Sequence, residues 1–207
     1  GRLLPAFGLG VVDPAEQQAF GVPREERAAR FDEALGLLRR LWREDAVDHD
    51  GRFFSFTGLT VRPKPVSAMD VWLGGRAPSE LRRAGRLGDG WLPSFVTPAE
   101  AEAGRALVEA AATDADRAID PEHFGALVLY QHGAGPLPAR LAELVTRRRP
   151  GTDPAEVIPS GVAALRAQLA RFVSVGFSKF VVMPATDPPA WDDELAELAA
   201  GVLPLQT

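Results

Sequence analysis

The chain has 207 residues, a formal net charge of −5 and 46% hydrophobic residues, which is enough to bury a sizeable core. It contains no cysteine, which excludes disulfides, thiolate metal ligands and cysteine nucleophiles. No apolar run approaches the roughly 20 residues that span a membrane, and the first residues lack the pattern of a signal peptide. The mild acidity argues against nucleic acid. We therefore expect a cytoplasmic protein with a small-molecule substrate and with neither nucleic acid nor a membrane as partner.

The first third of the chain predicts a strand, a long helix and an extended segment. Residues 3–9 are apolar and end in glycines, at Gly8 and Gly10. Residues 24–44 predict an amphipathic helix, because apolar side chains recur at three- and four-residue spacing. That stripe consists of Phe31, Ala34, Leu35, Leu38, Leu41 and Trp42. Residues 47–65 alternate weakly and then become rich in proline, which predicts an extended excursion.

The most informative stretch is residues 70–94. It predicts a strand at residues 70–73, a turn at Gly74 and Gly75, a helix opened by Pro78, and a second strand at residues 91–93. Glycines let a ligand approach the backbone, and the first N–H groups of a helix have no partner inside it. Together with the positive end of the helix dipole, these donors favour a phosphate.

Arginines surround the same turn: Arg76, Arg82 and Arg83 add positive charge there. Ser79 has no context of a nucleophile, so we expect it to help cap the helix. On this pattern alone the alternative stays open that Gly74 and Gly75 only make a tight turn.

The remaining chain continues the alternation of helices and strands. Thr97 is a good helix cap, with Glu100 three residues on, and the helix is expected to reach about residue 117. Arg147, Arg148 and Arg149 are expected to be the solvated end of a short helix. Ser160 is expected to cap a further helix that Gly176 ends. The other expected elements are strands at 124–130 and 179–183, both buried, helices at 138–148, 162–175 and 192–203, and a loop at 151–159.

Buried strands alternating with helices predict a parallel α/β fold, either an open doubly wound sheet or a (β/α) barrel. The strands, beginning near residues 3, 70, 91, 124 and 178, are fewer than a complete barrel contains. No repeat or linker divides the chain, so we expect a single domain over residues 1–207.

No metal site is expected from the histidines. His49, His123 and His132 are scattered, and no carboxylate stands at the spacing of a metal ligand. His132 follows a strand at the end where barrels keep their chemistry, but a loop role is favoured over a contact with substrate. Among the tryptophans, Trp42, Trp72 and Trp91 are expected in the core, and Trp191 is expected to staple the last helix.

The motifs in their order resemble the luciferase-like monooxygenase superfamily, in particular its actinobacterial coenzyme F420-dependent oxidoreductases. The matching segments are Arg2-Leu3-Leu4, Gly8-Leu9-Gly10, Glu16 to Pro23, Arg27, Arg30 to Ala34, Leu41-Trp42, Gly51 to Phe54, Arg62 to Pro65, Val71 to Gly75, Leu81 to Leu87 and Gly88 to Leu92. They cover nearly the whole chain without rearrangement.

The resemblance implies a (β/α)8 TIM barrel of the bacterial luciferase type that binds a flavin or deazaflavin at the carboxyl ends of its strands. It places the cofactor phosphate at Gly74, Gly75, Ala77 and Pro78, the turn that the physical argument also selects. It places Gly8 and Gly10 where the backbone approaches the ring of the cofactor. The implied cofactor is coenzyme F420, with flavin mononucleotide (FMN) as the alternative, and the implied assembly is a homodimer.

The resemblance also implies about three further βα units before residue 1, roughly 90 residues, so that only about the last five units are present. Because those units supply side chains near the reacting carbon, no catalytic residue is assigned. The leading hypothesis is an F420- or FMN-dependent oxidoreductase or monooxygenase that transfers hydride or activates oxygen. The alternative is a non-catalytic, truncated barrel that acts as a structural or partner-binding subunit.

Overall fold

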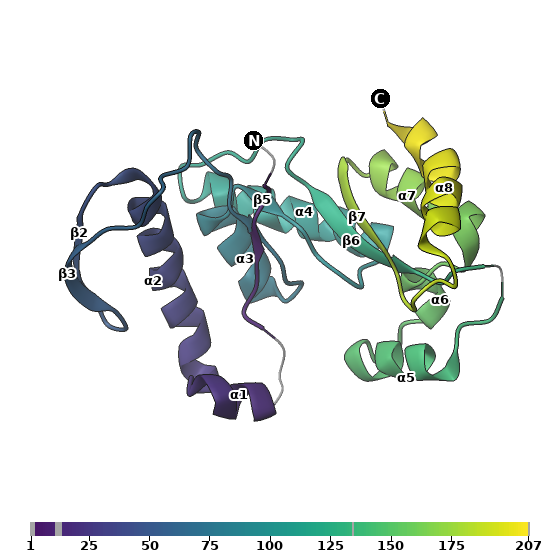
Figure 1. The fold of residues 1–207 in the computed structure, drawn as a ribbon, viewed down its shortest axis with the longest axis horizontal. Coiled ribbons are helices and arrows are strands. Elements are labelled where there is room, and N and C mark those ends of the chain that lie inside the picture. Colours follow the sequence, from purple (N-terminus) through teal and green to yellow (C-terminus); the bar gives the residue numbers. More distant parts are fainter. Residues whose placement is uncertain (1–2, 11–13, 134, 207) are drawn as a thin grey trace. The chain divides into compact units, whose positions relative to one another are not determined.

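The computed structural model describes residues 3–10, 14–133 and 135–206 (Figure 1). For Glu16 it describes the backbone alone. Arg2, part of the first quoted motif, lies outside the described residues. The chain forms two compact units, residues 1–71 and residues 72–207. None of the helices within the described ranges has the length and apolar character needed to cross a membrane.

The first unit is built around one long helix. Its elements are β1 (Ala6–Phe7), α1 (Pro14–Phe20), α2 (Arg24–Arg43), β2 (Val47–Asp50) and β3 (Ser55–Leu59). The helix α2 was expected at residues 24–44. It carries acidic residues in its first turn and basic residues in its last turn, which complements its dipole. Its buried residues are Leu35 and Leu37. Leu37 lies outside the predicted apolar stripe, and Trp42, expected in the core, is only half-buried.

The expected excursion after α2 is an antiparallel hairpin of β2 and β3, in which His49 pairs with Phe56. Glu33 on α2 joins the hairpin to the helix. Its carboxylate accepts hydrogen bonds from the backbone N–H of Phe53 and Phe54 at 3.1 and 3.0 Å, and it contacts His49 Nε2 at 2.9 Å. The alternation in residues 47–65 was too weak to predict these two strands. In the structure, the side chain of Glu33 on the preceding helix binds the hairpin.

The second unit holds a parallel sheet. Its elements in chain order are β4 (Trp72–Leu73), α3 (Pro78–Leu87), β5 (Gly90–Trp91), α4 (Pro98–Thr113), β6 (Gly125–Tyr130), α5 (Ala139–Arg148), α6 (Pro154–Val157), α7 (Gly161–Ser174), β7 (Lys179–Pro184), α8 (Trp191–Val202) and the 3-10 helix η1 (Leu203–Leu205). Strand β4 pairs with β5 and β6 with β7, both in parallel. Parallel bridges from Trp91 to Phe124 and from Ser94 to Leu127 connect β5 to β6. These strands therefore run parallel, as predicted, and each pairs with the next one along the chain.

The core of the second unit is aromatic. Trp72, Trp91, Phe124, Phe172 and Phe177 are almost fully buried. The ring of Phe177 lies 5.7 Å from that of Trp91 and 5.7 Å from that of Phe172, centroid to centroid. Helices α3 and α4 pack together, as do α7 and α8, and α7 also packs against β6 (Figure 1).

Several local expectations for this unit are wrong. Strand β7 is not buried on both faces, because its residues alternate and Val181 and Met183 are 42% and 46% exposed. The loop expected at 151–159 contains α6, which Asp153 caps. The helix after Thr97 ends at Thr113.

The ends of α7 and α8 also differ in detail from the prediction. Ser160 holds the cap position of α7 but makes no capping hydrogen bond with its side chain. The backbone there instead extends the sheet, through a parallel bridge between Gln131 and Ser160. Trp191 begins α8 with half of its surface exposed, so it does not staple the helix into the core.

Candidate cofactor-phosphate site

The turn between β4 and α3 has a backbone that only glycine adopts easily. Gly75 has a φ of 103°, and a Cβ atom there would lie 2.7 Å from the side chain of Glu80. The indole N–H of Trp91 donates to the carbonyl oxygen of Gly75 at 2.9 Å. Since Trp91 is 1% exposed, the turn is fixed to the core of the second unit.

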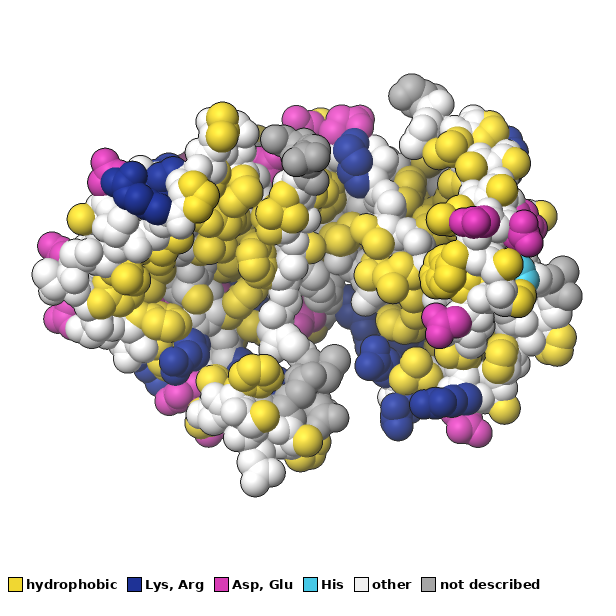
Figure 2. Space-filling view, in the orientation of Figure 1, with side chains coloured by type: hydrophobic (Ala, Val, Ile, Leu, Met, Phe, Trp, Pro, Cys, Tyr) yellow, Lys and Arg dark blue, Asp and Glu magenta, His cyan; other side chains and the backbone are white. Residues whose placement is uncertain are grey.

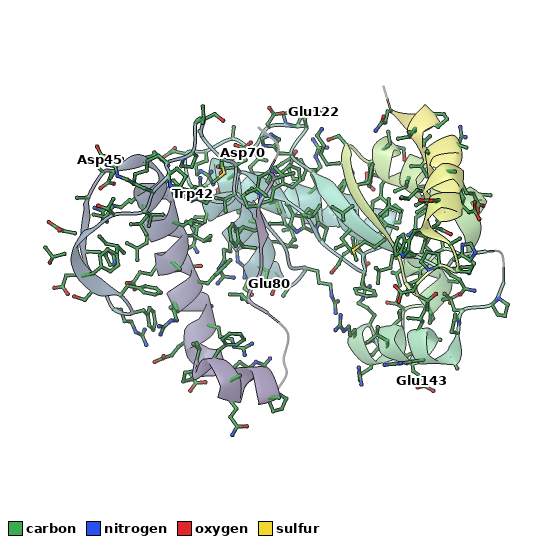
Figure 3. The ribbon with its side chains drawn as sticks, in the orientation of Figure 1. Trp42, Asp45, Asp70, Glu80, Glu122 and Glu143 are labelled. Atoms are coloured by element: carbon green, nitrogen blue, oxygen red, sulfur yellow. The ribbon has the colours of Figure 1, made fainter. Side chains whose placement is uncertain are left out.

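Two backbone donors at this turn converge on one point. The N–H groups of Arg76 and Ala77 both donate to Oε2 of Glu80, each at 2.9 Å. Glu80, labelled in Figure 3, lies in the first turn of α3, so its carboxylate serves as the internal cap of the helix. The capping that was expected of Ser79 is therefore done by Glu80, and the cap position itself is held by Ala77. The two N–H groups thus form a small anion site, which the carboxylate of Glu80 occupies in this structure.

The positive charge at this turn comes from a different set of arginines than predicted. Arg76 does lie there, and its guanidinium donates to the carbonyl oxygen of Arg148 at 2.7 Å. Burial, followed by the charge of Arg149, lowers the pKa of Arg76. Arg82 and Arg83 instead line a separate hollow between α3 and the end of α4. Sequence proximity misled here, because both residues follow the first turn of α3 and line a hollow shared with the end of α4.

Arg149 is the residue that the sequence analysis placed wrongly. It was expected to be solvated, but only 5% of its surface is exposed. Its guanidinium donates to Glu100 at 2.5 Å and to Thr152 at 3.1 Å, and also to the carbonyl oxygen of Phe95. Burial opposes ionisation of Glu100, but the N–H of Thr97 and the charge of Arg149 hold its pKa below the usual value. Figure 2 shows further Lys and Arg side chains over α5.

The structure brings Gly74, Gly75, Ala77 and Pro78 together in one turn of the second unit, as predicted. Gly8 and Gly10 lie in the first unit, where they line a pocket of about 380 Å³ with Phe31, Arg27 and Arg30. A Cβ at Gly8 would meet nothing within 4 Å, so the backbone is open to a ligand there. The sequence offered no signal for Glu80 as the internal anion beyond the Pro-Ser-Glu order at the helix start.

Comparison with known proteins identifies the class of protein. The family of luciferase-like monooxygenases matches residues 1–134, and the chain belongs to this family. An F420-dependent glucose-6-phosphate dehydrogenase of Beutenbergia cavernae is 31% identical over 140 residues, which is 58% of this chain and 41% of that protein. A 5,10-methylenetetrahydromethanopterin reductase of Archaeoglobus fulgidus is 30% identical over 114 residues, 55% of this chain and 34% of that protein.

Solved structures agree with this assignment of the fold. An F420-dependent secondary alcohol dehydrogenase, determined in complex with an F420-acetone adduct, superposes with a TM-score of 0.77 at 18% identity. The match covers 100% of this chain and 71% of that one. The expected fold class, the α/β barrel type of the luciferase-like proteins, is confirmed. The chain spans less than half the length of the two sequence relatives described above.

Proposed function

We propose that the chain is part of an F420-dependent oxidoreductase and that the turn from Gly74 to Pro78 binds the phosphate of the cofactor. The observation that carries the proposal is the convergence of the Arg76 and Ala77 N–H groups on one oxygen at the start of α3. A helix N-terminus with converging donors favours a phosphate oxygen for the same reasons that it favours a carboxylate. The choice of cofactor is supported by the names of two similar proteins, the F420-dependent glucose-6-phosphate dehydrogenase and the F420-dependent secondary alcohol dehydrogenase.

The residues of the turn fit such a group. Gly75 lets a phosphate approach without a side chain in its path, and the guanidinium of Arg76 adds a positive charge beside it. The phosphate would take the two N–H donors that Glu80 now accepts, so the Glu80 side chain has to turn away when the cofactor binds. The deazaflavin supplies the hydride donor or acceptor, while the protein binds, orients and shields it.

We further propose that Gly8 and Gly10 contact the ring of the cofactor in the pocket of the first unit. The lining is largely apolar apart from Arg27 and Arg30, which suits a flat heterocycle. FMN remains the second candidate because the family is named for monooxygenases. A homodimer and a small organic substrate also stay proposals.

The test is a fluorescence titration of the 207-residue chain with F420 and, separately, with FMN. Arg76→Ala is expected to weaken F420 binding about tenfold, which corresponds to about 1.4 kcal/mol. Arg82→Ala is the matched control, because Arg82 is exposed on the same helix and does not line the turn. Equal affinities of both variants and the parent for F420 would overturn the assignment, and tighter binding of FMN than of F420 would favour the second candidate.

A further inference from the structure

Phe95, which follows β5, has an uncommon backbone conformation. Its φ is 55°, in the left-handed region that bulky side chains rarely adopt. Such a conformation persists only where the surrounding structure enforces it, and it is found most often at functional sites. Phe95 comes directly after Ser94, the last residue that connects β5 to β6. It therefore lies toward the carboxyl end of β5, and barrel enzymes have their active sites at the carboxyl ends of their strands.

Three contacts hold Phe95 in place. Its carbonyl oxygen accepts a hydrogen bond from the buried guanidinium of Arg149. Its side chain packs against a buried hydrophobic cluster at α5 and α6. The guanidinium of Arg148 lies over its ring, with the central carbon 5.7 Å from the ring centroid. That distance is within the range of a cation–π interaction, so the ring holds a positive charge at this edge of the sheet.

Arg148 is exposed and has no anionic partner. It forms no ion pair with any residue that the structure describes. The neighbouring Arg149, by contrast, is paired with Glu100. A guanidinium presents several donors in one plane, which suits a phosphate or a carboxylate. The contact with the ring of Phe95 restricts the side chain of Arg148, and this lowers the entropy that binding a ligand costs.

Arg148 also lies next to the proposed phosphate turn. Its carbonyl oxygen accepts a hydrogen bond from the guanidinium of Arg76 at 2.7 Å. Burial and then the charge of Arg149 lower the pKa of Arg76, so positive groups crowd together here. The chain as a whole has a net charge of −5, which makes a local excess of arginine unusual for it. Crowded positive charges are stabilised by an anion placed beside them.

We propose that Arg148, positioned by Phe95, binds a phosphate or carboxylate group of the small organic substrate. The inference rests on the proposed function, in which the turn and Arg76 take the phosphate of the cofactor. The anion at Arg148 is then a second one, and it belongs to the other ligand of the reaction. Arg148 thereby selects anionic over neutral substrates.

The experiment is a ¹H–¹⁵N NMR titration of the full 207-residue chain with inorganic phosphate, first alone and then saturated with F420. Sodium chloride at matched ionic strength is the reference for screening. We expect the side-chain Nε–H signal of Arg148 to shift saturably with phosphate in both titrations. Arg148→Ala, followed through the amide of Phe95, is expected to bind phosphate about tenfold more weakly beside F420. Arg147→Ala is the matched control, because Arg147 is an exposed member of the same triplet.

A second pair of variants tests the role of Phe95. Phe95→Leu keeps an apolar side chain against the buried cluster but removes the aromatic face under Arg148. It is expected to bind phosphate about threefold more weakly, and Phe95→Tyr, which keeps the ring, is expected to bind it like the parent. Unchanged affinity of Phe95→Leu would show that the ring does not position Arg148.

The outcomes separate this inference from the proposed function. If phosphate no longer binds at Arg148 once F420 is bound, the anion belongs to the cofactor and the proposal is wrong. A shift of Arg148 no larger than with sodium chloride, or equal affinities of Arg148→Ala and the parent, would also overturn it. Failure of F420 to bind would contradict the proposed function instead, and the titration of the chain alone then still tests the anion site at Arg148.

Discussion

At the scale of single residues, Glu80 is the side chain that decides how the proposed phosphate site works. Its carboxylate takes the two N–H donors that an external anion would need. The same residue therefore caps α3 and, under the proposed function, would compete with the phosphate of the cofactor. The carboxylate of Glu80 thus occupies the position that the proposal gives to an external anion.

Glu80→Gln is expected to bind F420 about fivefold more tightly than the parent. Glutamine keeps the length of the side chain but removes a negative charge, worth about 1 kcal/mol at 4 Å in water, from the phosphate position. Fluorescence titration measures the effect, with Glu102→Gln, an exposed carboxylate on α4, as the control. A weaker complex for Glu80→Gln would mean that the carboxylate supports the site instead of competing for it.

In the first unit, the carboxylate of Glu33 likewise accepts hydrogen bonds from two backbone N–H groups. Burial disfavours its charge, but hydrogen bonds from His49 and from the N–H groups of Phe53 and Phe54 hold its pKa below the usual value of 4.5. A carboxyl whose pKa is lower in the folded state stabilises the fold above its unfolded pKa, and this stability is lost as pH falls through the folded pKa.

We therefore expect the parent to lose stability below about pH 4.3 more steeply than Glu33→Gln does. Urea unfolding between pH 3 and pH 7 measures this difference, and carboxyl NMR titration gives the pKa of Glu33 itself. Parallel pH profiles for the two proteins would show that the bonds from the hairpin contribute nothing to the acid sensitivity.

At the scale of elements, a buried arginine connects the end of α5 to the start of α4. Arg149 reaches Glu100, which at the same time forms the capping box of α4 with Thr97. The helix cap, the ion pair and the carbonyl of Phe95 thus share one guanidinium. The carbonyl oxygen of the neighbouring Arg148 accepts a hydrogen bond from Arg76 at the proposed phosphate turn.

Arg149→Ala is expected to lower the free energy of unfolding by about 2 kcal/mol, since hydrogen bonds to charged groups contribute about 1.5–3 kcal/mol. Arg147→Ala is the matched control in the same arginine triplet, where an exposed side chain is expected to change stability by less than about 0.5 kcal/mol. Urea denaturation of the three proteins measures both. If the two variants unfold alike, Arg149 does not carry the connection that its contacts indicate.

The elements also show which features the sequence can predict. The start of helix α4 was predicted correctly because its signal, Thr97, Pro98 and Glu100, lies within four consecutive residues. The capping contacts between Thr97 and Glu100 are present. The glycine turn was predicted for the same reason. The burial of Arg149, the exposure of β7 and the contact between His132 and Glu194 depend on partners distant in sequence. A pattern of neighbouring residues carries no information about such partners.

At the scale of the whole molecule, the fold is that of the luciferase-like family, and the parallel strands of the second unit follow one another in sequential order. The order of the motifs, through its resemblance to the luciferase-like family, predicted this fold better than the number of expected strands did. The strands are a weak guide because β4 and β5 contain only two residues each. The proposed function depends on whether the turn after β4 binds the phosphate of the cofactor.

The most direct measurement of that claim is a ¹H–¹⁵N NMR titration of the chain with F420. We predict that the amide signals of Arg76 and Ala77 shift most strongly, because their N–H groups exchange a carboxylate acceptor for a phosphate. The amide of Glu143 on α5 is expected to stay in place. If F420 binds while the signals of Arg76 and Ala77 remain unchanged, the phosphate lies elsewhere and the turn only starts a helix.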